Sequence, residues 1–266
     1  MVLQVPHQRI VVKFSGELLR DTPEETFSAG AIRRLTTALR GLQDGGIEYG
    51  VVIGAGNLFR GVESETIGFD QIVGDQIGML GTVMNALAVR EALSREGIVA
   101  HVMAPQPSIP SVLPVDPLLA RTLIAKKEPV LFAGGTGNPF FTTDSAATLR
   151  ALEIGASLLV KATKVRGVYS KDPVTNPEAK RYRMLSFEDA LQERLNVMDH
   201  TAVALAMRYG LSIFVYKFGD PLSILEALRS EDAGTYIVAE GLLQKPLKKT
   251  ERSSDGRKTI HRTYEE

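Results

Sequence analysis

The stretch that decides the fold is Gly134-Gly135-Thr136-Gly137-Asn138-Pro139-Phe140-Phe141-Thr142-Thr143-Asp144. It follows an apolar run at 130–133 that is typical of a buried strand. It precedes residues 145–153, whose apolar side chains fall on one face of a helix. The stretch is therefore predicted to join a strand to a helix. Its three glycines leave the backbone free to approach a ligand closely.

The second half of this stretch has the features of an anion site. Thr142, Thr143 and Asp144 are all favourable helix N-cap residues, and the free amides at such a helix start attract anions. Hydrogen-bonding side chains and two aromatic rings, which can stack on a base, lie beside them. These features favour a polar ligand, and an ordinary turn before a capped helix remains the alternative.

The composition is that of a soluble globular protein. Of 266 residues, 44% are hydrophobic and 23% charged, which is enough to build a sizeable core. The 31 basic and 31 acidic residues leave no net field, which argues against nucleic acid or an anionic membrane as a partner. Without cysteine, disulfides and thiolate metal sites are excluded. The start of the chain does not resemble a signal peptide, and no run of 18 apolar residues occurs, so we expect a cytoplasmic protein.

Alternating strand and helix patterns predict an α/β protein with one parallel sheet. Strands are expected at 9–14, 49–53, 99–103, 130–133, 157–161, 212–216 and, as a last edge strand, 235–238. Helices are expected after Ser28, at 72–96, 118–126, 145–153, 186–193 and 199–209, and from Pro221 with Asp220 as its N-cap. Five prolines between Pro105 and Pro117 predict a rigid loop or hinge between two halves.

Two lysines end predicted strands that are far apart in the sequence. Lys13 comes at the end of the first strand and Lys161 at the end of the fifth. Because ligands bind at the carboxyl edge of open α/β sheets, both ammonium groups are predicted to meet in one crevice. Two cations in one crevice favour phosphoryl transfer, in which negative charge builds up on the transferred group. The alternative is that each lysine packs its methylene chain against the protein and only extends its ammonium group to solvent.

A second glycine-rich loop, at 54–61, carries Arg60, whose guanidinium is well suited to grip a phosphate. It is not a dinucleotide-binding loop, because Phe59 stands where the third glycine is needed. The chain has no Gly-Lys dipeptide and hence no P-loop, and it lacks the motifs of protein kinases. Its four histidines are isolated and show no metal-ligand spacing.

Five segments resemble bacterial-type uridylate (UMP) kinases of the amino-acid-kinase superfamily. They are 13–17, 54–61, 75–80, 134–144 and 161–173. The likeness runs from about residue 9 to about residue 238 in the right order, and 136–143 is its most specific part. It implies a three-layer αβα sandwich with a mostly parallel central sheet. It also implies one domain at 1–240, with UMP over the amino half and ATP over the carboxyl half. Residues 241–266 are expected to be a polar, flexible tail.

The resemblance implies transfer of the γ-phosphoryl group of ATP to UMP, with Mg²⁺ as cofactor, in pyrimidine biosynthesis by a cytoplasmic homohexamer. It implies four catalytic residues, Lys13, Arg60, Asp144 and Lys161. For ATP it implies Lys13, Phe14, Ser15, Gly16, Gly56, Arg60, Thr163, Tyr169 and Asp172. For UMP it implies Ala55, Asp75, Thr136, Gly137, Asn138, Pro139, Phe140, Phe141, Thr142 and Thr143. No residue is assigned as a metal ligand.

Two residues depart from the family pattern. The family usually has three consecutive glycines where this chain has Gly54-Ala55-Gly56, and a methyl there is costly if Ala55 needs a positive φ. Arg166 stands where an acidic or amide residue is usual, which adds positive charge beside the expected adenine site. Two other functions therefore stay open. One is a kinase for a carboxylate or carbamate, and the other is a non-catalytic relative that binds a nucleotide or an oxyanion.

Overall fold

The computed structural model describes residues 8–59, 66–107, 109–193, 195, 198–219, 223–230 and 232–243. Its strands are β1 Arg9–Phe14, β2 Glu48–Ile53, β3 His101–Ala104, β4 Leu113–Pro114, β5 Val130–Phe132, β6 Leu158–Thr163, β7 Met184–Ser186, β8 Ser212–Lys217 and β9 Gly234–Val238. Its α-helices are α1 Ala29–Asp44, α3 Gln71–Arg95, α4 Pro117–Ala125, α5 Thr143–Ile154, α6 Phe187–Gln192, α7 His200–Tyr209, α8 Ile224–Arg229 and α9 Glu240–Leu243. A short 3-10 helix, η1, spans Gly16–Leu19.

The strands form one sheet, with the order β4-β3-β5-β2-β1-β6-β8-β9-β7 across the described residues. All neighbouring strands run parallel except β8 and β9, which are antiparallel. The mostly parallel sheet is therefore as expected. β1 and β6 are neighbours, and their register pairs Lys13 with Lys161. The two lysines thus lie side by side although they are 148 positions apart in the sequence.

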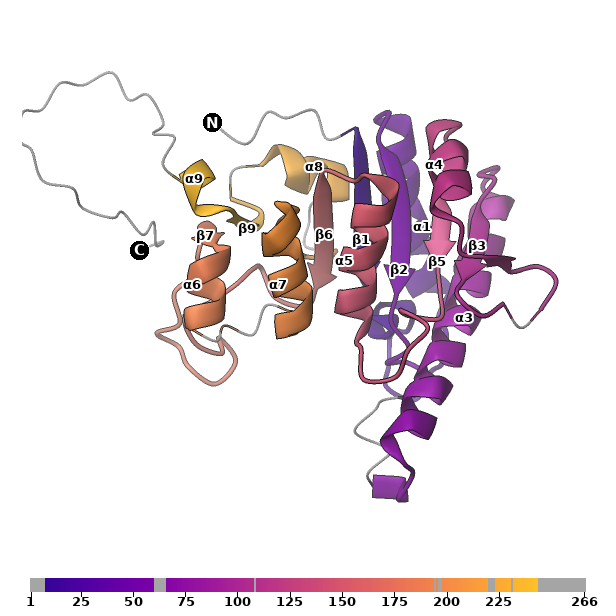
Figure 1. Ribbon diagram of the computed structural model, residues 1–266, viewed down its shortest axis with the longest axis horizontal. Coiled ribbons are helices and arrows are strands. Elements are labelled where there is room, and N and C mark those ends of the chain that lie inside the picture. Colours follow the sequence, from indigo (N-terminus) through magenta and orange to yellow (C-terminus); the bar gives the residue numbers. More distant parts are fainter. Residues whose placement is uncertain are drawn as a thin grey trace, which may run out of the picture.

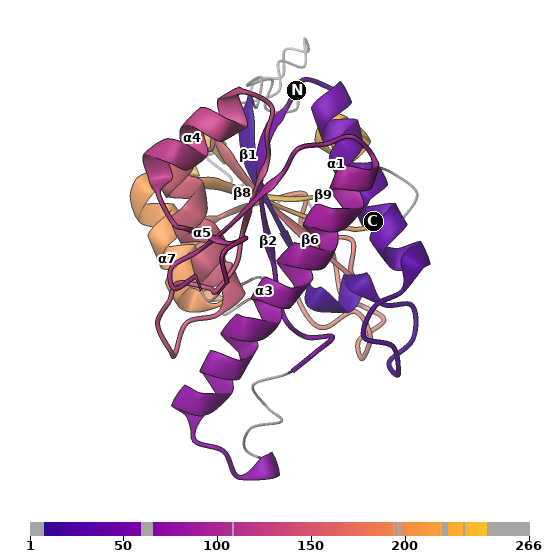
Figure 2. The same cartoon turned by 90° about the vertical axis from the view of Figure 1, so that its right-hand side faces the viewer.

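Helices cover both faces of the sheet, which makes the three-layer sandwich (Figures 1 and 2). On one face, Leu39 of α1, Val89 of α3 and Ile224 of α8 belong to one apolar core. On the other face, Ala151 of α5 and Ala206 of α7 belong to a second core, with α4 and α6 beside them. Parallel strands buried on both faces require apolar residues throughout, which is why the strand sequences read as nearly continuous apolar runs.

Three expectations about the elements were wrong. The strand at 235–238 is not at the edge, because β9 lies between β8 and β7, and β7 was missed. The prolines from Pro105 to Pro117 do not separate two halves, because β4 within them forms the opposite edge of the sheet and Pro117 begins α4. α8 begins at Ile224, with Ser223 and Glu226 forming a capping box, while Asp220 and Pro221 lie outside the described residues.

α3 is long and apolar, and only part of it packs on the sheet. An 18-residue window of it has a mean hydropathy of 1.3, so length and composition alone would also suit a membrane-crossing helix. Its C-terminal half is a layer of the sandwich, where Val83, Ala86, Val89 and Leu93 are buried. Its N-terminal half projects beyond the sandwich (Figure 1) and exposes Leu80, and Met84 next to Val83 is exposed as well.

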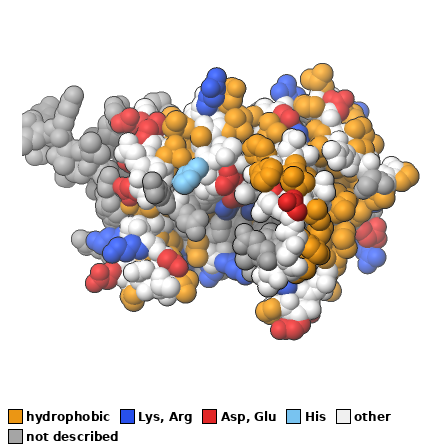
Figure 3. Space-filling model, turned by 60° about the horizontal axis from the view of Figure 1, so that its bottom comes forward, with side chains coloured by type: hydrophobic (Ala, Val, Ile, Leu, Met, Phe, Trp, Pro, Cys, Tyr) orange, Lys and Arg blue, Asp and Glu red, His pale blue; other side chains and the backbone are white. Residues whose placement is uncertain are grey.

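The carboxyl ends of the central strands meet at one edge of the sheet, on the side where α3 projects (Figure 1). The loops that leave β1, β2, β5 and β6 all begin there. Figure 3 looks toward this edge, where blue lysine and arginine side chains lie in a hollow near the middle of the molecule. This edge is where the sequence-predicted site residues come together.

Candidate active site

A buried ion-paired cluster lies at the carboxyl edge of the sheet. The Nζ of Lys13 is 2.8 Å from Oδ1 of Asp144, and the Nζ of Lys161 is 2.7 Å from Oδ2 of the same carboxylate. The lysines come from the adjacent strands β1 and β6, and Asp144 comes from the first turn of α5. One carboxylate thus fixes two ammonium groups close together, as the sequence had predicted for the lysines.

Burial and charge act against each other in this cluster. Asp144 is only 8% exposed, and burial by itself would raise the pKa of its carboxyl. The two lysines outweigh burial and hold that pKa below its ordinary value. Burial lowers the pKa of Lys161, and the nearby charge of Lys13 adds to this, while Asp144 opposes both. The cluster keeps one net positive charge, which is suited to an incoming anion.

The start of α5 is held in place from α7. Thr142 is the N-cap of α5, and its Oγ1 accepts hydrogen bonds from the amides of Asp144 and Ser145. Asp199, the N-cap of α7, accepts hydrogen bonds from the hydroxyls of Thr142 at 2.5 Å and Ser145 at 2.9 Å. The negative charge of Asp199 also raises the pKa of Lys161 in opposition to burial. Asp199 therefore positions the helix turn that carries Asp144.

The loop between β5 and α5 has an unusual backbone. Residues with a positive φ are Gly134 at 71°, Gly135 at 60°, Gly137 at 87° and Phe140 at 68°. Two residues of α3 hold this loop, because Thr82 accepts a hydrogen bond from the Gly134 amide and Asp75 accepts one from the Phe140 amide, both at 2.7 Å. The ring of Phe140 is 72% exposed and that of Phe141 is 48% exposed. Both aromatic side chains are therefore accessible to a ligand.

The loop after β2 is held by a pair of buried amides. Asn57 and Asn85 donate to each other's side-chain oxygens, at 3.1 and 2.7 Å, and Asn85 also donates to the Gly54 carbonyl at 2.7 Å. Ala55 needs no positive φ, since in the described part of the chain Lys127 and Phe140 are the non-glycine residues with one. The methyl of Ala55 therefore carries no cost in backbone strain.

The loops after β1 and β2 touch each other through their backbones. A Cβ added to Gly16 would lie 2.8 Å from the amide nitrogen of Gly56 and would also clash with the Gly54 carbonyl. Ser15, directly before it, caps η1 by accepting a hydrogen bond from the Glu17 amide. Glycine at position 16 is thus required for this close approach.

Comparison with known proteins identifies the family. Residues 8–217 match the amino acid kinase family. A uridylate kinase of Methylococcus capsulatus is 46% identical over 234 residues, which cover 87% of this chain and 97% of that protein. A uridylate kinase of Legionella pneumophila is 42% identical over 236 residues, covering 89% and 96%. The chain belongs to the uridylate kinases of the amino acid kinase family.

The structure of this uridylate kinase family member is also similar to solved structures. The crystal structure of a UMP kinase from Bacillus anthracis superposes with a TM-score of 0.85 at 34% identity, covering 88% of this chain and 97% of that one. A UMP kinase from Ureaplasma parvum gives a TM-score of 0.83 at 31% identity, covering 87% and 98%. The expected amino-acid-kinase fold is therefore confirmed.

The structure of this family member brings some of the predicted site residues together and leaves others apart. Lys13, Asp144 and Lys161 are in direct contact, and Asp75 contacts the loop that contains the predicted uracil residues. Arg60, which the sequence placed among the catalytic residues, lies outside the described residues. The predicted ATP residues after β6 are engaged in their own loop. Thr163 bonds Val165, Tyr169 forms an isolated β-bridge with Arg181, and the Asp172 carboxylate accepts a hydrogen bond from the Val174 amide.

Sequence reasoning missed four residues that shape the site: Thr82, Asn57, Asn85 and Asp199. Asn85 is fully buried within the apolar face of α3, and a polar residue in such a face was the available signal. In the sequence, Asp199 stands out only as the first residue of the helix expected at 199–209. It does cap α7, but it also binds the start of α5, and nothing in its local sequence indicates that partner.

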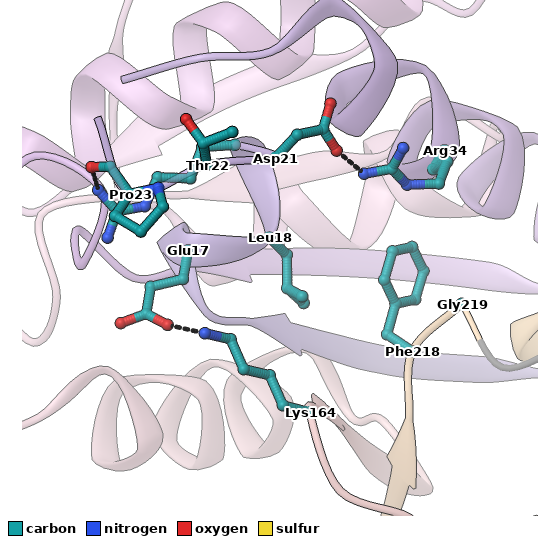
Figure 4. Close-up of a pocket in the computed structure, with 10 residues that line it drawn as sticks. Glu17, Leu18, Asp21, Thr22, Pro23, Arg34, Lys164, Phe218 and Gly219 are labelled. Atoms are coloured by element: carbon teal, nitrogen blue, oxygen red, sulfur yellow. Dashed lines mark hydrogen bonds and ion pairs between the residues drawn. The ribbon is translucent and has the colours of Figure 1, made fainter. Parts of the chain in front are cut away.

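A separate pocket of about 390 Å³ lies beside η1 (Figure 4). Its walls include two ion pairs, Glu17 with Lys164 and Asp21 with Arg34. The Glu17–Lys164 pair joins the loops after β1 and β6, next to Gly16 and Thr163. Pockets for small molecules are usually lined mainly by apolar groups, and these charged walls are already paired with each other. We therefore assign this pocket no ligand.

Proposed function

We propose that this chain transfers the γ-phosphoryl group of ATP to UMP, giving ADP and UDP, in pyrimidine nucleotide biosynthesis. The observation that carries the proposal is the Lys13–Asp144–Lys161 cluster at the carboxyl edge of the sheet. A fixed pair of ammonium groups can stabilise the charge that develops on the transferred group without reorganising during the reaction. Membership in the uridylate kinases supports UMP as the acceptor.

In the reaction, an oxygen of the UMP phosphate forms a bond to the γ-phosphorus of ATP, and the bond from that phosphorus to the β,γ-bridging oxygen breaks. Lys13 and Lys161 neutralise the γ-phosphoryl oxygens and the leaving ADP. Asp144 keeps both ammonium groups in place and does not take a proton. A general base is unnecessary, because the attacking phosphate is already an anion.

The loops at the carboxyl edge of the sheet, together with Asp75 of α3, supply the binding sites in this proposal. The amides of Ala55 and Gly56, with Arg60, hold the UMP phosphate, and Asp75 takes the ribose. Uracil contacts Thr136, Asn138 and Thr143. ATP contacts the segment from Lys13 to Gly16, together with Gly56, Arg60, Thr163, Tyr169 and Asp172. The exposed rings of Phe140 and Phe141 support a base site in the loop before α5.

Magnesium is proposed to enter with ATP. Among the described residues there is no group of three or more acidic or histidine side chains that could hold an ion. This fits Mg²⁺, which commonly keeps several waters and binds through substrate phosphates with one or two carboxylates. Asp144 is the carboxylate available within the cluster. When bound, the ion would neutralise charge on the phosphate oxygens.

We also propose that the enzyme works in the cytoplasm as a homo-oligomer, specifically a hexamer. The support is an exposed apolar surface on and before α3, formed by Ile67, Phe69, Ile72, Val73, Leu80 and Met84, each at least 43% exposed. In Figure 3 orange side chains gather on the half of the molecule that holds α3 and α4. Exposed patches of this kind commonly mark protein interfaces. Analytical ultracentrifugation of the purified protein tests this part.

The activity test uses purified protein with Mg-ATP and a panel of UMP, CMP, AMP and acidic amino acids, with ADP release as the measurement. Rapid ADP release with UMP supports the proposal. Release with an amino acid and none with UMP would replace it with a carboxylate kinase. If UMP binds but no acceptor yields ADP, the chain is a non-catalytic nucleotide-binding relative.

A further inference from the structure

Ala55 places a methyl group where the family pattern has glycine. Its backbone is ordinary, because Ala55 is not among the residues with positive φ. The substitution therefore raises a question of space only. The protein must leave room for one carbon atom between the loop after β2 and whatever packs against it.

That room lies on α3, at Gly81. A Cβ added to Gly81 would be 2.9 Å from the Cβ of Ala55 and 3.6 Å from the side chain of Leu58. Nonbonded carbon atoms do not approach to 2.9 Å without one of them moving. Gly81 is buried in the interior of a helix, where glycine is otherwise unfavourable relative to alanine. The Ala55 methyl accounts for glycine at this position.

α3 holds the same loop again one turn later. Asn85 follows Gly81 by four residues and so lies on the same face of the helix. Its amide donates to the Gly54 carbonyl at 2.7 Å and exchanges hydrogen bonds with Asn57. The loop is thus fixed to α3 by a van der Waals contact at one turn and by hydrogen bonds at the next.

The loop is also in close contact with Gly16. The backbone of Gly16 approaches Gly56 so closely that a Cβ on Gly16 would lie 2.8 Å from the Gly56 nitrogen. A methyl added at position 81 would shift the loop against Gly16 or stretch its hydrogen bonds to Asn85. Either movement changes the separation of the loops after β1 and β2.

We propose that Gly81 is a positioning residue of the site that binds the UMP phosphate. Ala55 and Gly81 form one packing unit, meaning that the space between the loop after β2 and α3 holds a single methyl group. The inference rests on the proposed function, which assigns the Ala55–Gly56 amides to the UMP phosphate. Because the space accepts one methyl, that methyl can come from either partner. Moving it from residue 55 to residue 81 should preserve the site, and adding a second one should not.

The experiment compares the wild type with Ala55→Gly, Gly81→Ala and the double variant Ala55→Gly/Gly81→Ala. Gly81→Ala should raise KM for UMP on the order of tenfold, with a smaller change in KM for ATP, because a displaced loop misplaces the acceptor. Ala55→Gly should raise KM for UMP by about twofold. The double variant should return KM for UMP to within about twofold of the wild type, and its Tm should recover in parallel.

Gly41→Ala in α1 is the matched control, since it adds a methyl to a helix glycine with nothing within 4 Å of the new atom. It should leave KM for UMP unchanged. A double variant as impaired as Gly81→Ala, or a Gly81→Ala variant with wild-type KM and Tm, would overturn the proposal. If Gly81→Ala does not fold, a soluble and active double variant supports the packing unit, and an insoluble one refutes it. If the Tm of the double variant recovers as expected but the variants change KM for ATP alone, the packing unit stands and the assignment of the loop to UMP fails.

Discussion

The two glycine-rich loops of this protein differ in how strictly they require glycine. In the loop between β5 and α5, Gly134, Gly135 and Gly137 all have a positive φ, which side chains other than glycine rarely adopt. In the loop after β2, Gly54 and Gly56 have no positive φ, and a Cβ at either position would meet its nearest neighbour at an ordinary contact distance of 3.4 or 3.5 Å. The first loop therefore needs glycine for its conformation. In the second the tight position is Gly16, which faces the loop from η1.

The loops also deliver different groups to the site. The loop before α5 ends in Asp144, which fixes two buried ammonium groups. The loop after β2 is proposed to bind the UMP phosphate through the amides of Ala55 and Gly56. Changes at the charged cluster should therefore lower turnover, whereas changes in the loops should act on substrate affinity and stability. The following predictions test this division, beginning with the largest effect.

Lys161→Ala should lower kcat by about 100-fold or more, because it removes a preorganised charge that acts mainly in the transition state. KM for UMP should change by no more than about twofold, since the UMP loops do not depend on the ammonium group. Steady-state kinetics with varied UMP at saturating Mg-ATP measure both constants. Unchanged turnover would remove Lys161 from the mechanism, and an increase in KM alone would abolish the proposed division between cluster and loops.

Asp144→Asn should move the basic limb of the kcat profile to lower pH. Burial lowers the pKa of Lys161 and Asp144 opposes this, so removing the carboxylate charge lowers that pKa further. The lysine then loses its proton, and the enzyme its activity, at a lower pH than in the wild type. We also expect kcat to fall about tenfold at neutral pH because the ammonium groups lose their common anchor. The pH profiles of kcat for the wild type and the variant test this prediction. A basic limb that stays in place or moves to higher pH would contradict the effect of the Asp144 charge on the pKa of Lys161.

Much of this fold and of the cluster could be predicted from the sequence, because the signals involved lie within short stretches of the chain. Buried strands and amphipathic helices leave periodic apolar patterns, and lysines at strand ends must reach the carboxyl edge of a parallel sheet. Partners that meet only after folding leave no such pattern. Asp199 contacts the start of α5 across more than 50 residues, and Gly81 needs to be small only because of Ala55. β7 was missed because a strand of 3 residues is too short to show a period.

The need for glycine before α5, and the lack of such a need at Gly56 after β2, can be tested by two alanine substitutions. Gly137→Ala forces alanine into a φ of 87° and brings its Cβ to 2.7 Å from Pro105. It should cost about 2 kcal/mol or more and lower Tm by about 4 °C or more. Gly56→Ala has no positive φ, and its nearest neighbour would be at 3.5 Å, so its Tm should stay within about 2 °C of the wild type. Thermal unfolding without nucleotides measures both, and equal losses would show that the two loops do not differ.

The smallest expected effects concern the attachment of α5 to α7, where two hydroxyls bind the same carboxylate. Thr142 and Ser145 each donate one hydrogen bond to Asp199, but the proposed UMP site includes only Thr142. Ser145→Ala should cost about 1 kcal/mol and lower Tm by about 2–4 °C, because it removes one hydrogen bond to a charged group. Thr142→Ala should cost about 1 kcal/mol more, because it also removes the N-cap of α5. Only Thr142→Ala should also raise KM for UMP, by about threefold, whereas Ser145→Ala keeps both kinetic constants. If both variants raise KM equally, the position of the helix start, and not a contact from Thr142, determines how this loop binds UMP.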